Sequence, residues 1–353
     1  MNNKSLTCWN RSRSRFDRFK KDFVLSSTDQ TTRFGIIGTG RITRRLVADL
    51  QSTDNVSVTA IASRTDERAR WYADQYGVAN AVTGYQQLIQ RDDVDAVYIS
   101  LPPSMHAEWS IAAADAGKHV LCEKPLALNT DQALAIAAAA EKNSVRWLDA
   151  TGWLHHPRTD AFRAALADGR LGEVGHISAS VSFFSPFQSD DHRLKPELGG
   201  GCLLDLAWYA GGLALFATNE LPQRVFASAV LKDGVPHRVT AMLWFAGDVS
   251  ATLSCGFDTA TRKWFEIAGS DASLVCDDFT RPWMQRPTRC WIHDASGDVE
   301  QLTFQGNQER EMIARLVGDQ PLDSWHNQAI NTHRLLDALQ ESIASSCQIV
   351  LDT

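Results

Sequence analysis

Near its N-terminus the chain contains the run Arg33-Phe34-Gly35-Ile36-Ile37-Gly38-Thr39-Gly40-Arg41-Ile42-Thr43. The short apolar stretch before the glycines is typical of a strand that is buried on both faces. From residue 42 onward the apolar residues recur at helical spacing. The glycines therefore fall in a strand–turn–helix unit, where the backbone can approach a pyrophosphate and the helix N-terminus stabilises it. This pattern predicts a dinucleotide site that includes Gly38, Thr39, Gly40, Arg41 and Ile42.

The end of the next predicted strand, over residues 56–62, distinguishes between the two nicotinamide cofactors. An acidic residue there binds the ribose 2′-hydroxyl of NAD, whereas an arginine accommodates the 2′-phosphate of NADP. The chain continues as Ser63-Arg64-Thr65, with no carboxylate before Asp66. Ser63 can donate a hydrogen bond to a phosphate, and Arg64 can pair with it or stack on adenine. We therefore expect NADP, with NAD as the alternative cofactor and a solvated loop as the alternative role for Arg64.

The pattern of elements predicts two domains. Strands expected at 34–38, 56–62, 95–100, 119–122 and 145–148 alternate with helices, as in βαβ units. After about residue 152 one helix is followed by consecutive strands with turns between them, and a last helix is expected at 327–345. We expect an α/β protein with a Rossmann-type, doubly wound parallel sheet at residues 33–152. Residues 153–353 would form an α+β domain on an open, mostly antiparallel sheet.

Composition and charge exclude several classes of protein. The chain has 353 residues, of which 44% are hydrophobic, and a net charge of −7. Residues 1–33 carry +5 and the remainder −12, so the main body is a poor nucleic-acid binder. The longest uncharged apolar run, at 207–217, is too short to span a membrane. For the basic segment 1–32 we expect a disordered arm or a misassigned start codon, and an arm that binds nucleic acid or a subunit is the alternative.

The seven cysteines are scattered, with no spacing typical of a metal site. We therefore expect no metal site, reduced thiols buried as small hydrophobes, and a cytoplasmic location.

Two further motifs carry residues suited to chemistry. Cys122-Glu123-Lys124-Pro125 lies at the end of the predicted strand 119–122, at the sheet edge where such folds hold ligands. Partial burial would lower the pKa of Lys124 and let it exchange a proton with a substrate oxygen, whereas an exposed charged turn is the plainer interpretation. Gly199-Gly200-Gly201 opens an apolar helix in which Asp205 and Tyr209 lie four residues apart, on one face. Taken alone, these two polar residues fit structural capping as well as catalysis.

The order of these motifs resembles that of the glucose–fructose oxidoreductase/inositol dehydrogenase/rhizopine-catabolism (Gfo/Idh/MocA) family. The resemblance covers residues 33–350 and is closest to the branch with sugar dehydrogenases, glucose–fructose oxidoreductase and dimeric dihydrodiol dehydrogenase. It is supported by the fragments Leu101-Pro102-Pro103-Ser104-Met105-His106, His155-His156-Pro157 and Arg193-Leu194-Lys195-Pro196-Glu197-Leu198. Three residues depart from the family pattern. Thr43 and Trp208 affect packing, and Pro103 removes a side-chain donor near the nicotinamide.

The resemblance implies roles for individual residues. Lys124 would hydrogen-bond the reacting oxygen, Tyr209 would act as acid/base, and Asp205 would orient the substrate. Further cofactor contacts would come from Leu101, Pro102, His106, Glu123 and Lys124, and further substrate contacts from His155 and Arg193.

The implied function is an NADP-dependent oxidoreductase that transfers a hydride between the nicotinamide and a carbinol carbon of a sugar or polyol. One alternative is a glycoside hydrolase or lyase that uses tightly bound nicotinamide for transient oxidation. The other is a non-enzymatic sugar-nucleotide sensor or scaffold. The resemblance also implies a homodimer or homotetramer joined through the outer face of the second sheet, with no nucleic-acid or membrane partner.

Overall fold

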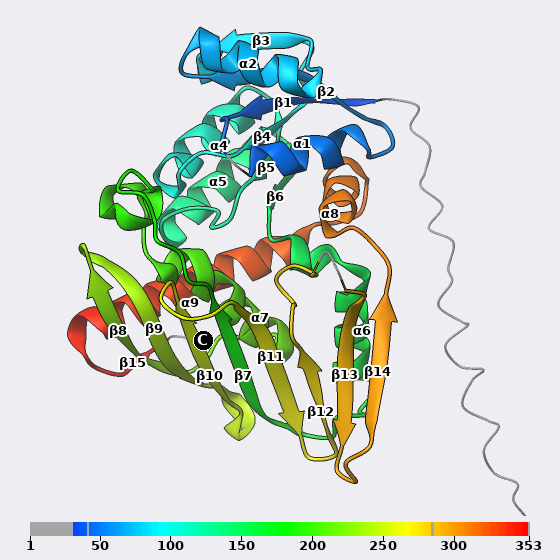
Figure 1. The fold of residues 1–353 in the computed structure, drawn as a ribbon, viewed down its shortest axis with the longest axis vertical. Coiled ribbons are helices and arrows are strands. Elements are labelled where there is room, and N and C mark those ends of the chain that lie inside the picture. Colours follow the sequence, from blue (N-terminus) through cyan, green and yellow to red (C-terminus); the bar gives the residue numbers. More distant parts are fainter. Residues whose placement is uncertain (1–30, 41, 284–285, 352–353) are drawn as a thin grey trace, which may run out of the picture. The chain divides into compact units, whose positions relative to one another are not determined.

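The computed structural model describes residues 31–40, 42–283 and 286–351 (Figure 1). Residues 1–30 of the expected basic arm lie outside the described residues, and so does Arg41 of the predicted dinucleotide site. The first strand, β1, begins already at Thr32.

The first sheet is entirely parallel and has the strand order β3-β2-β1-β4-β5-β6. The first strand, β1, lies in the middle of this sheet. The next two strands add on one side of it and β4 to β6 add on the other, as in a doubly wound fold. Its strands are β1 (Thr32–Ile37), β2 (Val56–Ser63), β3 (Asn80–Thr83), β4 (Ala96–Ile99), β5 (His119–Cys122) and β6 (Trp147–Asp149).

Helices connect these strands, and the apolar residues of β1 and β4 are fully buried between them. Asn129 caps α5 by accepting a hydrogen bond from the backbone of Gln132, which fixes where that helix begins. The connecting helices are α1 (Thr43–Gln51), α2 (Asp66–Tyr76), α3 (Tyr85–Ile89), α4 (His106–Asp115) and α5 (Thr130–Lys142).

The second sheet has nine strands in the order β14-β13-β12-β11-β7-β10-β9-β8-β15, and among its pairs only β7 and β10 are parallel. Alternate residues of β7 and β9 are buried, so one face of the sheet is covered and the other is open. The strands are β7 (Val174–Ser182), β8 (Arg224–Lys232), β9 (Val235–Trp244), β10 (Ser250–Gly256), β11 (Arg262–Gly269), β12 (Ala272–Cys276), β13 (Thr288–Asp294), β14 (Val299–Phe304) and β15 (Ile349–Val350).

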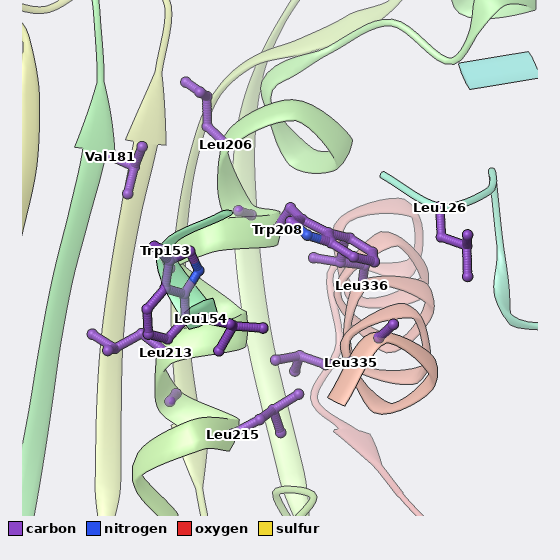
Figure 2. Close-up of a cluster of buried hydrophobic side chains, with 14 of the residues drawn as sticks. Leu126, Trp153, Leu154, Val181, Leu206, Trp208, Leu213, Leu215, Leu335 and Leu336 are labelled. Atoms are coloured by element: carbon purple, nitrogen blue, oxygen red, sulfur yellow. The ribbon is translucent and has the colours of Figure 1, made fainter. Parts of the chain in front are cut away.

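The covered face packs against α6 (Pro157–Ala167), α7 (Trp208–Thr218) and α9 (Asp323–Ser345). Figure 2 shows the centre of this core, where Trp153, Trp208 and Leu335 are almost completely buried. The helix α9 also contacts α5 of the first sheet, so one hydrophobic core runs through both halves of the chain. Together the two sheets confirm the predicted α/β fold.

The helix α8 (Gln308–Val317) has no counterpart among the elements predicted from the sequence. Its residues Met312, Ile313 and Leu316 are buried in the core of the first sheet, where α8 contacts α1. The strand β14 was also not predicted, because most of its residues are exposed and its apolar alternation is weak.

One segment, Pro196–Thr218, is long and apolar enough to cross a membrane, but 67% of its most apolar window is buried in the protein. That is typical of a core helix. The expectation of buried thiols holds for five of the described cysteines and is wrong for Cys347, which is exposed in the turn between α9 and β15. Cys8 lies outside the described residues.

Candidate active site

The glycine loop is held close to the end of β4. Gly38 has φ at 104°, a conformation that side chains other than glycine rarely adopt. A Cβ on Gly38 would lie 2.7 Å from the Ser100 carbonyl oxygen, whereas one on Gly40 would lie at an ordinary 3.5 Å. Thr43, in place of the third glycine, is fully buried, and its hydroxyl lies 2.7 Å from that of Ser100. The loop thus offers the close backbone approach that a pyrophosphate needs.

The end of β2 presents the expected pair of residues and a second arginine. Ser63 is buried and Arg64 is exposed. Arg68, one helical turn further along, donates to the Thr39 hydroxyl at 2.6 Å and to the Thr39 carbonyl oxygen at 2.8 Å. The signal for it in the sequence was a second arginine four residues after Arg64.

A lysine, an aspartate and an arginine from three distant segments meet at the centre of the candidate site. Lys124 Nζ lies 2.5 Å from Asp205 Oδ1 and also donates to the Asp205 backbone oxygen at 2.9 Å. Arg193 Nε donates to the other carboxylate oxygen at 2.7 Å. The Lys124 and Asp205 side chains are only 13% and 14% exposed. The structure therefore brings together three of the predicted site residues.

The charges in this cluster support one another. Burial alone would lower the pKa of Lys124, but the neighbouring Asp205 and Tyr209 outweigh it, so the pKa is raised. The expectation of a lowered lysine pKa was therefore wrong, because the sequence did not reveal that a carboxylate lies beside the ammonium group. Burial would likewise raise the pKa of Asp205, but Lys124 and Arg193 hold it well below its usual range. Lys124 is consequently an ammonium group at neutral pH.

The helix that carries Asp205 is irregular at this point. Leu203–Ala207 forms a π-helical turn, which passes into α7 at Trp208. Such turns are uncommon and often mark functional sites. Tyr209 follows directly, and its ring centre lies 4.9 Å from Lys124 Nζ. Burial raises the pKa of Tyr209, and the charge of Lys124 offsets part of this rise. Asp205 and Tyr209, which their spacing predicted to share one face, therefore both contact Lys124.

Glu123 lies beside this cluster on a cavity of about 120 Å³. Tyr98, at the end of β4, donates a 2.6 Å hydrogen bond to the Glu123 carboxylate, which also accepts one from the Lys124 backbone at 3.3 Å. Burial raises the pKa of Glu123. The cavity reaches from Ile42 at the start of α1 to Lys124 and Tyr209. This is the place expected for the nicotinamide half of a dinucleotide.

Two histidines expected to contact ligands have other partners. The ring nitrogens of His106 lie 2.7 Å from the Pro125 carbonyl oxygen and 2.8 Å from that of Leu101, so they brace two loops. His155 is 2% exposed and stacks on Trp325, because its short 3₁₀ turn directs it into the core. In this structure the two rings brace loops and pack in the core, and their direct contact with a ligand stays a prediction.

The three departures from the family pattern all have packing roles. Besides Thr43, Trp208 is buried and donates to the Thr151 hydroxyl at 2.7 Å. Pro103 packs against Gly199, where a Cβ would lie 2.9 Å from the proline Cβ.

Two of the predicted cofactor contacts, Leu101 and Pro102, lie next to these residues. Leu101 packs beneath Gly38, at 3.0 Å from the position of a Cβ there, and Pro102 precedes the 3₁₀ turn that Pro103 opens.

Within the described ranges, no three His, Cys, Asp or Glu side chains are grouped as a metal site would require. By contrast, the tight glycine loop, the serine and arginines after β2 and the cavity beside Lys124 fit a nicotinamide dinucleotide.

Two family models match the chain. A model described as an oxidoreductase family with an NAD-binding Rossmann fold covers residues 32–149, and the C-terminal domain model of the same family covers residues 159–275. The chain belongs to the GFO/IDH/MocA family of oxidoreductases. This confirms the resemblance seen in the motifs and the assignment of the chain as an enzyme.

Relatives with known names are dehydrogenases and reductases with different substrates in their names. The D-xylose 1-dehydrogenase (NADP(+)) 2 of Haloferax volcanii is 32% identical over 90% of this chain and 99% of its own length. The scyllo-inositol 2-dehydrogenase (NADP(+)) IolU of Bacillus subtilis is 28% identical over 88% and 97%. A crystal structure of a 3-ketoreductase from Actinomadura kijaniata, in complex with NADP and TDP-benzene, has a TM-score of 0.82 and 30% identity. It covers 89% of this chain and 98% of the ketoreductase.

Proposed function

We propose that this enzyme uses NADP to transfer a hydride to or from a carbinol carbon of a sugar or polyol. The observation that carries the proposal is the position of Lys124. Its ammonium group lies between the Asp205 carboxylate and the Tyr209 ring, on a cavity that extends to Ile42 at the start of α1. The NADP-dependent relatives and the absence of a carboxylate before Asp66, just after β2, support NADP over NAD.

When bound, the nicotinamide supplies the hydride chemistry, and the chain supplies position and protons. In reduction, the substrate's carbonyl carbon gains the hydride and its oxygen gains a proton from Lys124 or Tyr209. Both groups hold their protons at neutral pH, because their pKa values are raised. Asp205 keeps the ammonium group charged and in place, so that Lys124 can hydrogen-bond the reacting oxygen. The resting site is therefore suited to reduction, and oxidation is favoured as the pH rises.

The test is to mix the protein with NADP⁺ or NADPH and a panel of aldoses, polyols, ketoses and nucleotide-linked sugars, and to follow the nicotinamide absorbance. Lys124→Met is expected to retain NADP affinity and to lose turnover by about 100- to 10,000-fold. Lys142→Met, at an exposed lysine, is the matched control. Unchanged turnover in Lys124→Met would overturn the role assigned to this residue.

The same assay separates the alternatives. Substrate conversion with no net change in cofactor redox state would favour a hydrolase or lyase with bound nicotinamide. Nucleotide binding without any turnover, and unaffected by Tyr209→Phe, would favour a sensor.

We also propose that the open face of the second sheet joins two copies of the chain. Support comes from apolar side chains on the edge of that face. Phe226 and Met242 are register partners on β8 and β9 and are 40% and 43% exposed, and Val230 nearby is 47% exposed. Light scattering on a sizing column is expected to show a dimer or tetramer, and a Phe226→Glu/Met242→Glu variant is expected to dissociate it.

A further inference from the structure

The active-site cavity contains an arginine that the hydride transfer described above does not use. Arg281 lies in the segment that connects β12 and β13, two strands of the second sheet. Its side chain nevertheless lines the same cavity as Lys124 and Tyr209, together with Arg45 from α1. The cavity is therefore bordered by guanidinium groups from both halves of the chain.

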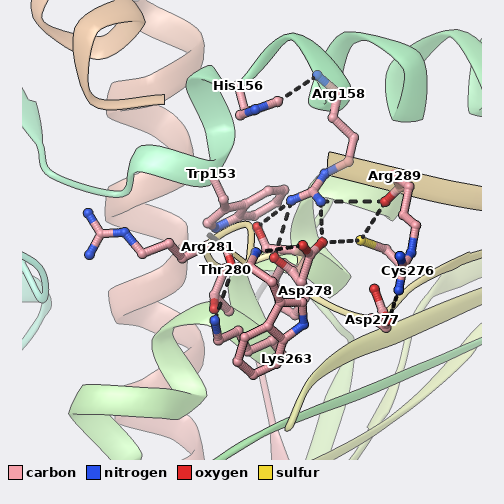
Figure 3. A network of polar contacts seen from close by, with 12 residues as sticks. Trp153, His156, Arg158, Lys263, Cys276, Asp277, Asp278, Thr280, Arg281 and Arg289 are labelled. Atoms are coloured by element: carbon pink, nitrogen blue, oxygen red, sulfur yellow. Dashed lines mark hydrogen bonds and ion pairs between the residues drawn. The ribbon is translucent and has the colours of Figure 1, made fainter. Parts of the chain in front are cut away.

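A buried polar network fixes the backbone around Arg281 (Figure 3). Arg158 and Asp278 form an ion pair in which both side chains are 1% exposed. Arg158 also donates to the Phe279 carbonyl oxygen at 3.0 Å, and Asp278 accepts from the Trp283 backbone at 3.0 Å. Such a network holds the segment in one conformation.

The Arg281 side chain leaves this network and points away from its other charged groups (Figure 3). Lys263 Nζ donates a 3.0 Å hydrogen bond to the backbone carbonyl oxygen of Arg281, which leaves the Arg281 guanidinium group to other partners. The guanidinium group pairs with Glu309 at the start of α8. The ion pair thus links a segment of the second sheet to a helix that packs in the core of the first.

Two buried polar atoms on this wall have no partner among the described residues. They are Arg281 Nε, a donor, and Gln308 Oε1, an acceptor. Gln308 is only 6% exposed and lines the cavity, and its amide nitrogen is already bonded to the Glu309 carboxylate at 3.1 Å. Buried polar groups are rarely left unpaired in proteins. A ligand that offers both an anionic oxygen and a hydroxyl or amide donor would satisfy both atoms.

The local charge favours an anion. Burial lowers the pKa of Arg45, and the positive charge of Arg281 lowers it further, against the opposing effect of Glu309. The same surplus of positive charge acts on Lys263, whose pKa is lowered by burial and by Arg281 and Arg45. The first turn of α1 adds the positive end of a helix dipole.

We propose that Arg281 is a cofactor-binding residue contributed by the second domain, and that its guanidinium group, with Arg45, binds the diphosphate of NADP. Gln308 accepts a hydrogen bond from the adjoining ribose or carboxamide. In the absence of cofactor, Glu309 holds Arg281 at the cavity. This inference rests on the proposed NADP-dependent function.

The test compares ligands that contain or lack the diphosphate, with affinities measured by titration calorimetry. NADP and 2′-phospho-ADP-ribose contain it, whereas 2′-AMP carries only the phosphate of the adenosine end. Arg281→Gln is expected to weaken the first two by about 10- to 100-fold, the contribution of a charge-assisted hydrogen bond, and to leave 2′-AMP unchanged. Arg286→Gln, at an exposed arginine of the same segment, is expected to bind all three as the wild type does.

Glu309→Gln separates binding from a structural role. If Arg281 contacts the diphosphate, this variant binds NADP as tightly as the wild type or more tightly, because a competitor for the guanidinium group is gone. Equal losses in Arg281→Gln and Glu309→Gln would overturn the proposal, since the ion pair alone would then matter. An Arg281→Gln affinity for NADP within about twofold of the wild type, or an equal loss for 2′-AMP, would overturn it too. If the wild type binds 2′-AMP but not NADP, the proposed function fails together with this inference.

Discussion

Removing the charge of Asp205 is expected to lower the pKa of Lys124. Lys124 Nζ lies 2.5 Å from the Asp205 carboxylate, and both side chains are largely buried. Asp205→Asn keeps the shape of the side chain but removes the negative charge that offsets the burial of the ammonium group. A charge-assisted hydrogen bond contributes about 1.5–3 kcal/mol, and one pH unit corresponds to about 1.4 kcal/mol. We therefore expect the pKa of Lys124 to fall by about 1 to 2 pH units.

Two measurements report this shift. Competitive labelling of amines, read by mass spectrometry across a pH series, gives the pKa of Lys124 directly and requires no turnover. In sugar oxidation, the pH limb of kcat/KM that reflects loss of the lysine proton is expected to move to lower pH by the same amount. Lys124 still holds its proton at neutral pH after such a fall, because its pKa starts above the ordinary value. The variant is therefore expected to lose activity in reduction mainly at alkaline pH, where Lys124 gives up its proton earlier than in the wild type.

Asp258→Asn is the matched control, because Asp258 pairs with Arg238 at 3.2 Å near the surface, away from the cavity. It is expected to leave the labelling curve and the pH profile unchanged. If Lys124 in Asp205→Asn titrates at the wild-type pH or higher, the carboxylate does not hold the lysine charged. The electrostatic account of the site would then be refuted.

Two further predictions concern stability. Burial raises the pKa of Asp149 to about 6. The folded state therefore binds the carboxyl proton more tightly than the unfolded state does, and stability is lost as the pH rises through this pKa. Between about pH 4 and pH 7 the wild type is therefore expected to lose up to about 3 kcal/mol of unfolding free energy that Asp149→Asn does not lose, as measured by urea titration. If the unfolding free energies of variant and wild type change equally with pH, the prediction is contradicted. Asp278→Asn leaves Arg158 buried without its counter-charge and is expected to cost about 3–5 kcal/mol of unfolding free energy. Asp160→Asn, at an exposed ion pair with Arg163, is its control and is expected to cost less than about 1 kcal/mol, and similar losses in both variants would show that the buried pair contributes nothing special.

Local patterns in the sequence determined much of the fold and part of the site. The alternation of strands and helices predicted the parallel sheet, because buried strands and connecting helices leave their period in the sequence. The glycine turn was recognisable because the conformation at Gly38 is one that glycine alone adopts readily. The four-residue spacing predicted that Asp205 and Tyr209 lie on one face, and both contact Lys124 although a π-helical turn intervenes.

Only the tertiary structure decided what surrounds each polar group. The raised pKa of Lys124 depends on a carboxylate 81 positions away in the chain, and no local pattern encodes that pairing. His106 and His155 have the residue type of ligand contacts, but burial gave them other partners. Arg281 lines the cavity from the segment between β12 and β13, and Gln308 lines it from the start of α8. Neither element carries a recognisable motif. Charge and burial at a site are sums over neighbours distant in sequence, and the sequence alone does not fix those neighbours.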